Sequence, residues 1–429
     1  MDEIKKWTLY LIFLVAGFAT GIGSIGLFPQ FWLQYGMTGM AVHLVFLAVF
    51  TYVAILEAET VMKSGYYFVE LYTKVARKPG MILSILTVVA MFLSYYAANT
   101  MLSILSPVLG TGTVARLIAK VIMFALAFLI LTRAREKTFT IMAVGSVFFV
   151  LAVLVTTIAF KTQIPENAAF LGMAKHMLVA THGITLEMIK AAAERALYGI
   201  GLGFGFYLML GSFLNERFNA KLIIGTGIFI QLLIGVLSTI TIVYAIAPTT
   251  PERLLTYVYG GSEGAIALLG ELPEILSNYQ ILLVLIGLST FFAGITSLLP
   301  TAEVGLQIIE SMLGVGRTRA ATYLIGISLL IGILDSPPSV ADMIVRAVVI
   351  ATFFTAIFEL YPVATSKNRL STPSMVIVGI AVLLFLVGGL YAFFGVFRAG
   401  GIYVVSGILA AAIVLFGLLG DSLVSQETP

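Results

Sequence analysis

The sequence contains no cysteine, few charged residues and only three histidines. With no cysteine among 429 residues, disulfide bonds and thiolate metal sites are excluded. The histidines, His43, His176 and His182, lack the spacing of metal ligands, so a histidine metal site is not expected. Charged residues make up 10% of the chain, against about 25% in soluble proteins. The net charge of +3 is small and the basic residues are scattered over short connections, so we expect no nucleic-acid partner.

Most of the chain is apolar. Hydrophobic residues make up 60% of it and the mean hydropathy is +1.07, which is more than a soluble core of this size can bury. A membrane-spanning helix takes roughly 20 apolar residues, and charge-poor runs of that length recur along the whole chain. This pattern predicts an all-α protein of the lipid bilayer with about twelve transmembrane helices. The predicted spans are 7–34, 40–62, 82–107, 115–132, 139–160, 188–214, 221–247, 279–312, 320–334, 341–361, 374–396 and 401–420.

The basic residues between the spans predict the orientation. If the N-terminus is inside, the cytoplasmic connections carry Lys63, Lys74, Arg77, Lys78, Arg133, Arg135, Lys137, Arg217, Lys221, Arg317, Arg319, Lys367 and Arg369. The opposite connections carry Lys161, Lys175, Arg253 and Arg398, mixed with Glu252, Glu263, Glu271 and Glu274. Because lysine and arginine accumulate on the cytoplasmic side, we expect both termini in the cytoplasm and the protein in the cell (inner or plasma) membrane.

Two spans contain runs of glycine near their centre. The first reads Ala16-Gly17-Phe18-Ala19-Thr20-Gly21-Ile22-Gly23-Ser24-Ile25-Gly26, and the sixth reads Tyr198-Gly199-Ile200-Gly201-Leu202-Gly203-Phe204-Gly205. Glycine costs about 1 kcal/mol relative to alanine inside a helix, so both stretches are candidates for broken helices. The alternative is that these glycines only let neighbouring helices pack closely.

The two glycine runs lie five helices apart, which is the spacing expected of two inverted five-helix repeats. We therefore expect a first repeat in 1–160, an extracellular loop in 161–187 and a second repeat in 188–361. Two accessory helices and a tail would follow in 362–429. Broken helices at matching positions of two repeats indicate the central site of a transporter.

Several motifs resemble one family in order and position. They are Trp7 with Ala16-Gly17, Gly21-Ile22-Gly23 and Phe28-Pro29; Glu57; Ser94-Tyr95-Tyr96; Leu202-Gly203-Phe204-Gly205 with Ser212; Gly264-Ala265-Ile266-Ala267 with Leu272-Pro273-Glu274; and Phe292-Ala293-Gly294-Ile295-Thr296-Ser297 with Glu303. Together, from about residue 7 to 360, they resemble the neurotransmitter:sodium symporter family, whose members have the leucine-transporter fold.

The resemblance implies sodium sites. The family's second sodium site corresponds to the carbonyl groups of Gly17, Thr20 and Ala293 and the hydroxyl groups of Thr296 and Ser297. Alternatively, adjacent threonine and serine only bond back to carbonyls one turn earlier. The first sodium site corresponds to Ala19, Ser24, Gly199 and Gln231, where two of the family's ligands are shortened or missing. We therefore expect one sodium ion per cycle and no organic cofactor.

The resemblance also implies the substrate. Amine carriers of the family have aspartate where this chain has Gly21, and amino-acid carriers have glycine, so an amino acid is expected. Its carboxylate would lie near Gly21, Gly23 and the Tyr96 hydroxyl. The remaining pocket residues would be Phe18, Ala19, Tyr198, Gly199, Gly201, Phe204, Ser297 and Thr301. The small Gly199 and Gly201 favour a branched, aliphatic or aromatic side chain, although Phe204 and Tyr198 could equally fill the bundle core.

Charges at the start of the sixth span indicate a gate. The family's outer-gate arginine is Leu27 here, and we expect Arg195, next to Glu194, to replace it by pairing with Asp342. Alternatively, Arg346 pairs with Asp342 one turn away, or Arg195 reaches the substrate carboxylate. Tyr96 and Tyr198 would complete this gate. At the inner face, Trp7 with Lys5 and Lys6 would latch the N-terminus to Glu303 or Glu310.

These features predict a sodium-coupled symporter that imports an amino acid by alternating access. The family's chloride ligands look absent, because Arg195 and Gly235 stand in their places. A sodium-independent or proton-coupled transporter of the same fold and a non-transporting sensor or scaffold are the alternatives. An intramembrane enzyme is disfavoured, since the spans lack an aspartate pair, a His-Glu zinc motif and a GxSxG motif. The sequence does not indicate the oligomeric state.

Overall fold

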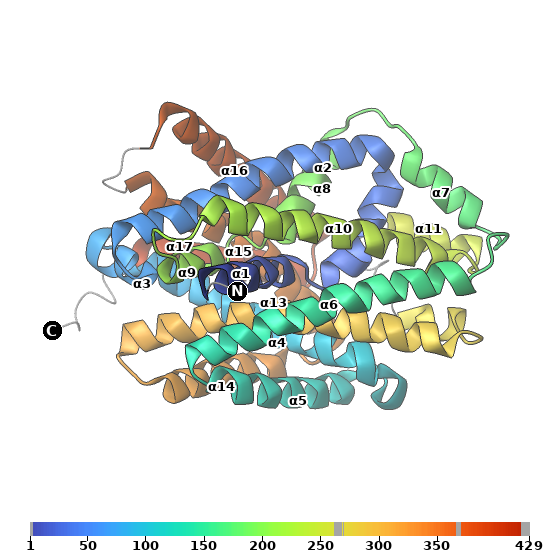
Figure 1. Cartoon of the computed structure of the whole chain (residues 1–429), viewed down its shortest axis with the longest axis horizontal. Coiled ribbons are helices and arrows are strands. Elements are labelled where there is room, and N and C mark those ends of the chain that lie inside the picture. Colours follow the sequence, from blue (N-terminus) through green and yellow to red (C-terminus); the bar gives the residue numbers. More distant parts are fainter. Residues whose placement is uncertain (1–2, 261–267, 269, 366–369, 422–429) are drawn as a thin grey trace.

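The structure is a computed structural model that describes residues 3–260, 268, 270–365 and 370–421, and every regular element in these ranges is a helix (Figure 1). Among the described residues, nine helices are long and apolar enough to cross a membrane. They are α2 (Ile22–Ser64), α4 (Pro79–Leu109), α5 (Thr113–Leu131), α6 (Arg135–Gln163), α10 (Ala220–Ile246), α13 (Gln280–Leu313), α14 (Arg317–Leu334), α15 (Pro338–Thr365) and α16 (Thr372–Ala399). The protein is therefore an integral membrane protein.

Shorter helices complete the predicted spans or connect them. The broken spans and the last span contain α1 (Glu3–Ala19), α8 (Leu186–Ile200), α9 (Phe206–Phe213) and α17 (Tyr403–Leu419). The connecting helices are α3 (Phe68–Glu70), the π-helix η1 (Leu71–Val75), α7 (Leu171–Val179) and α11 (Pro251–Tyr259). Polar caps fix several starts: side-chain oxygens of Thr185, Asn219 and Ser371 accept bonds from first-turn N–H groups of α8, α10 and α16.

The first predicted span is broken, and its second half continues into the second span. Helix α1 ends at Ala19 and α2 begins at Ile22. Helix α2 then bends at Gly36, where φ is 56° and ψ is −151°. A hydrogen bond to another segment stabilises the bend: the N–H of Met37 donates at 2.9 Å to the carbonyl of Ala180, which follows α7. A Cβ at Gly36 would overlap that carbonyl oxygen, so only glycine fits.

The sixth predicted span is broken in the same way. Helix α8 ends at Ile200, and α9 begins at Phe206. Between them Gly201, Gly203 and Gly205 have φ values of 82°, 91° and 77°, a left-handed conformation that other residues rarely adopt. The predicted twelve spans with broken first and sixth helices are thus confirmed. The predicted limits of the two repeats stay predictions.

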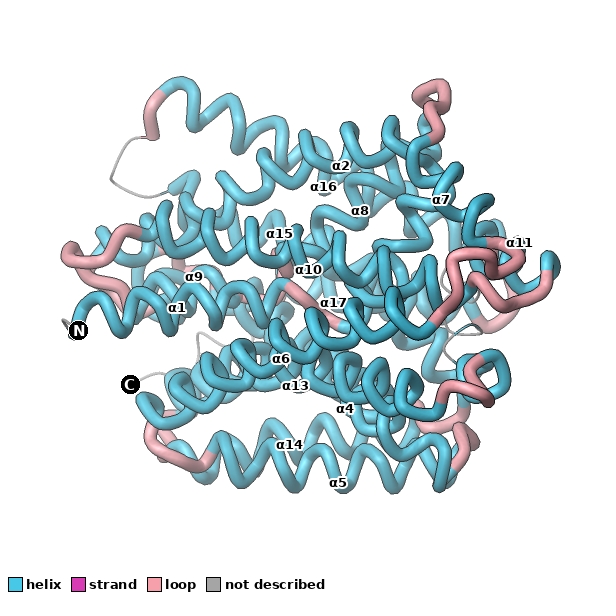
Figure 2. The backbone as a smooth tube through the Cα atoms, turned by 45° about the vertical axis from the view of Figure 1, so that its right-hand side comes forward, coloured by secondary structure: helices cyan, strands magenta, loops and turns pink. Residues whose placement is uncertain are grey.

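The helices form one bundle whose centre contains both breaks. Helix α1 packs against α6, α10 and α13, while α2 packs against α8, α9 and α10. Helices α5 and α14 lie side by side along one edge (Figures 1 and 2). Figure 2 shows that α1 begins at the end opposite α7 and α11. The motif segment Gly264–Ala267 and the charged residues Glu263, Lys367 and Arg369 lie outside the described residues.

Candidate functional site

The break in the first span brings three predicted site residues together. The N–H of Ile22 donates to the Tyr96 hydroxyl of α4 at 2.8 Å. A Cβ at Gly21 would lie 2.5 Å from that hydroxyl oxygen and 3.4 Å from Oγ of Ser297. Glycine is therefore required for this approach. Because α2 begins here, its N-terminal N–H groups and positive dipole end lie at this break, as an anion site needs.

Next to this point, α13 carries two adjacent hydroxyl groups, one of which bonds to α1. Oγ of Ser297 donates to the carbonyl of Phe18 at 3.0 Å and to that of Gly17 at 3.3 Å. Oγ1 of Thr296 bonds back to the Phe292 carbonyl at 2.7 Å and to the Ala293 carbonyl at 3.2 Å. The Thr296 bond matches the alternative of one-turn back-bonding, whereas the Ser297 bonds cross between helices.

The five residues predicted for the second sodium site lie along this contact. A Cβ at Gly17 would lie 3.1 Å from Cβ of Thr296, so the two helices touch there. Thr20 lies in the break itself, where its hydroxyl donates to the Ala16 carbonyl at 2.6 Å. The contact thus gathers neutral carbonyl and hydroxyl oxygens, the ligands that a hard cation prefers.

Sequence reasoning missed a further hydroxyl at this contact. Ser146 of α6 is buried, and a Cβ at Gly17 would overlap its Oγ. That Oγ donates to the Met142 carbonyl at 2.9 Å and keeps its lone pairs for another group. In the sequence, the pair of small residues Gly145-Ser146 inside an apolar span was the feature that could have indicated this hydroxyl.

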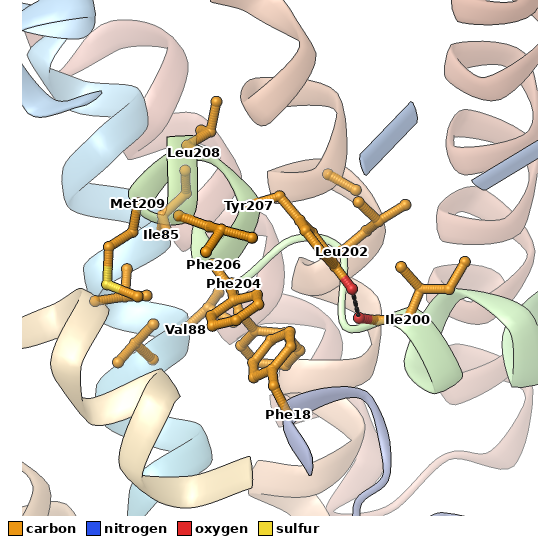
Figure 3. Packing of buried hydrophobic residues seen from close by; sticks show 14 of the residues in the cluster. Phe18, Ile85, Val88, Ile200, Leu202, Phe204, Phe206, Tyr207, Leu208 and Met209 are labelled. Atoms are coloured by element: carbon orange, nitrogen blue, oxygen red, sulfur yellow. Dashed lines mark hydrogen bonds between the residues drawn. The ribbon is translucent and has the colours of Figure 1, made fainter. Parts of the chain in front are cut away.

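Aromatic rings close the region between the two breaks (Figure 3). Phe18 stacks on Phe206 with centroids 3.8 Å apart, and a Cβ at Gly201 would lie 2.5 Å from the Phe18 ring. Phe204 packs on Phe92 at 5.0 Å, and Phe92 stacks on Tyr96 at 4.4 Å. Phe206 and Phe92 were not predicted, because an aromatic residue beside a break has the same pattern as one in the core.

The hydroxyl groups of two predicted pocket residues already donate to backbone carbonyl groups of helices. The Thr301 hydroxyl donates to the Ser297 carbonyl at 2.8 Å, one turn along α13. The Tyr198 hydroxyl donates to the Val349 carbonyl of α15 at 3.0 Å. Tyr198 therefore joins α8 to α15.

Of the residues predicted for the first sodium site, two lie in contact. A Cβ at Gly199 would lie 3.3 Å from Nε2 of Gln231, whose Oε1 is buried without a hydrogen-bond partner in the described part of the chain. The N–H of Ser24 donates to the Gly21 carbonyl at 2.9 Å, and Ala19 ends α1. Among the described residues, no hydrogen bond joins Ser24 to Gln231.

The predicted Arg195–Asp342 pair is not formed. Arg195 donates to its neighbour Glu194 at 2.9 Å, and Arg346 donates to Asp342 at 3.0 Å. Each arginine pairs with a residue of its own helix, because such a pair needs no movement of one helix toward another. All four side chains line a cavity of about 570 Å³, together with residues of α2 and α16.

The predicted inner latch is also wrong. Glu303 accepts two bonds from Arg317, at 2.5 and 2.8 Å, and Glu310 accepts one from Arg135 at 2.7 Å. Trp7 instead packs edge-on against Tyr10, with ring centroids 5.7 Å apart. Two arginines at the starts of α6 and α14 bind the carboxylates that the N-terminus was expected to bind.

Two buried carboxyl groups lie behind the sixth-span break. Glu359 of α15 accepts bonds from the N–H groups of Gly203, at 2.6 Å, and Gly205, so it satisfies donors that the break exposes. Glu57 of α2 is fully buried beside it, and neither of its oxygens has a hydrogen-bond partner among the described residues. Glu359 was not predicted, although an acidic residue in an apolar span was a visible signal.

Comparisons with known proteins identify the fold. No family model and no curated protein matches the sequence. Among solved structures, the chain is similar to the crystal structure of MhsT in complex with L-phenylalanine. The TM-score is 0.63 at 17% sequence identity, and the match covers 90% of this chain and 98% of MhsT. At this identity the likeness establishes the fold, and it confirms the predicted leucine-transporter fold.

Proposed function

We propose that this protein is a symporter that imports an amino acid with an apolar or aromatic side chain, driven by sodium. The observation that carries the proposal is the meeting of Gly21, Tyr96 and Ser297 at the first break. There a substrate carboxylate would accept hydrogen bonds from the N-terminus of α2, either in place of the Tyr96 hydroxyl or together with it. The fold shared with MhsT, whose structure holds L-phenylalanine, supports an amino acid as substrate.

The sodium ion would bind beside the substrate. Its ligands would be the carbonyl oxygens of Gly17, Thr20 and Ala293 and the hydroxyls of Thr296 and Ser297. In the ion-bound state the two hydroxyls would turn their lone pairs to the cation and give up their present acceptors. Because Ser297 touches both this contact and Gly21, ion and substrate would stabilise the same arrangement of α1 and α13.

The charge balance favours chloride independence. Arg195 already pairs with Glu194, and Gly235 has no hydroxyl to offer an anion. The lysine and arginine bias of the connections supports a cell-membrane location with both termini in the cytoplasm. The cavity lined by Arg195 and Asp342 would then face outside and admit the substrate.

Thermal unfolding of the detergent-purified protein tests the proposal. Each proteinogenic amino acid is added in sodium chloride and in choline chloride. We expect one or a few apolar or aromatic amino acids to raise the melting temperature only in sodium. Thr296→Ala should abolish this stabilisation, whereas Thr290→Ala should keep it, because Thr290 makes the same kind of one-turn bond away from the site. Equal stabilisation in both salts would contradict sodium coupling.

A second candidate is proton-coupled transport on the same fold. It is favoured by Glu57, a buried carboxyl group that has no hydrogen-bond partner within the described ranges and lies beside the Glu359 carboxylate. Two neighbouring buried carboxylates avoid carrying charge together by holding a proton. In that case an amino acid would stabilise the protein equally in both salts, the effect would vary with pH, and Glu57→Gln would remove the pH dependence.

A further inference from the structure

A chain of hydrogen bonds connects α9 to α13 at the predicted cytoplasmic end. The N–H of Phe68, the first residue of α3, donates to Oγ of Ser212 near the end of α9 at 3.0 Å. Beside it, the Tyr67 hydroxyl donates to Oε1 of Gln307 on α13. Nε2 of Gln307 in turn donates to Glu303 at 2.7 Å. The segment that follows α2 is thus hydrogen-bonded both to α9, through Phe68, and to α13, through Tyr67.

Two ion pairs at this end join α13 to other helices. Arg317 of α14 holds Glu303 of α13, and Arg135 of α6 holds Glu310 of α13. Alternating access, on which this inference rests, would move α1, α2, α8, α9 and α10 relative to α4, α5, α13 and α14. The Arg317–Glu303 pair therefore lies within the static set, and the Arg135–Glu310 pair ties that set to α6. The Tyr67–Gln307 bond, in contrast, crosses from the segment that follows α2 to the static set.

The ion pairs also set the direction of this bond. Because the Glu303 carboxylate only accepts, the amide of Gln307 must present its N–H₂ group to it. Its oxygen is then left for Tyr67, which must donate. Burial raises the pKa of the Tyr67 hydroxyl, so this donor keeps its proton at physiological pH.

We propose that the Tyr67–Gln307 hydrogen bond is the latch that holds the cytoplasmic end closed and breaks in each transport cycle. A neutral hydrogen bond suits this role, because breaking it costs far less than separating a buried ion pair. Phe139 of α6 and Phe213 of α9 add an apolar contact between the moving set and α6, with ring centroids 4.7 Å apart. The ion pairs would remain intact and keep Gln307 oriented.

A single introduced cysteine can report the opening, because the chain has none of its own. Ser146→Cys places a thiol at a buried position against Gly17, deeper than Phe139 on the same helix. A membrane-impermeant maleimide is added to the face that carries the termini, in oriented vesicles, in sodium-free buffer. Labelling needs neither substrate nor sodium, so its result is independent of whether the proposed cargo is correct. Met142→Cys is a second reporter if Ser146→Cys does not fold.

Tyr67→Phe, combined with the reporter, should raise the labelling rate about fivefold, the effect of losing one hydrogen bond from the closed state. The matched control Tyr66→Phe, at an exposed neighbouring tyrosine, should leave the rate unchanged. Gln307→Met should raise it similarly, and adding Tyr67→Phe to Gln307→Met should cause no further change. Unchanged labelling in Tyr67→Phe, or an equal increase from Tyr67→Phe in both Gln307 backgrounds, would overturn the proposal.

Discussion

The charged side chains around the cavity at one end of the bundle pair differently from those of α13 at the other end. At the predicted extracellular end, Arg195 pairs with the adjacent Glu194, and Arg346 pairs with Asp342 on its own helix. These pairs restrain single helices and leave a cavity of about 570 Å³ between them. The charge pairs that line this cavity therefore do not hold one helix against another.

At the predicted cytoplasmic end, the pairs that α13 makes cross between helices. Arg317 is 14% exposed and holds Glu303, which is fully buried, while Arg135 binds Glu310 from a third helix. Such contacts fix helices to one another, since a buried charge cannot leave its partner without a large cost. The comparison indicates a cavity at one end and cross-helix ion pairs at the other, as expected of one of the two states in the proposed alternating-access cycle.

The largest expected effect comes from breaking a cross-helix pair. Arg317→Gln leaves the buried Glu303 carboxylate uncompensated and should lower stability by about 3–5 kcal/mol. Arg195→Gln, its counterpart at the open end, removes a half-buried charge from a cavity wall and should cost about 1 kcal/mol or less. Thermal unfolding of both variants in the same detergent measures the difference. Similar losses for the two would contradict the contrast between the ends.

An intermediate effect is expected between the ends, at the first break. Gly21→Ala would place its Cβ 2.5 Å from the Tyr96 hydroxyl and force α2 and α4 apart, at a cost of about 1–3 kcal/mol. Stabilisation by amino acids should disappear, because the proposed carboxylate site lies there. Gly225→Ala in α10 is the control, since nothing lies within 4 Å of its Cβ. If Gly21→Ala still responds to amino acids, the carboxylate site is misplaced.

The smallest stability effect is expected at the open end. Asp342→Asn removes a partly exposed pair within one helix and should change stability by about 0.5 kcal/mol or less. A salt titration of the melting temperature checks this, because screening should remove the small difference. A loss above about 2 kcal/mol would mean that Asp342 already acts across helices in this state.

Much of the fold was predictable, but the pairing of charges was not. Apolar runs indicate the spans, and glycines such as Gly201 and Gly203 mark the break, because only glycine adopts their φ values without strain. The meeting of Gly21 with Ser297 needed the family resemblance, since the two lie far apart in the sequence. Arg195 was assigned a distant partner although Glu194 is its neighbour.

Residues were missed where their chemistry depends on another helix. Ser146 looks like any small polar residue in an apolar span until α1 brings Gly17 against it. Glu359 gains its role only because the break in the sixth span frees the N–H groups of Gly203 and Gly205. The N-terminal latch failed for the opposite reason, since α14 starts with an arginine that reaches Glu303 first.

The central claim, coupling of amino-acid movement to sodium, is tested most directly by uptake into proteoliposomes. The protein is reconstituted in potassium-loaded vesicles, and the radiolabelled amino acid that stabilises it best is added with either sodium or choline outside. The account predicts accumulation above the external concentration only with the sodium gradient, and its loss in Thr296→Ala. Accumulation that is equal in choline, or follows a proton gradient instead, would contradict it.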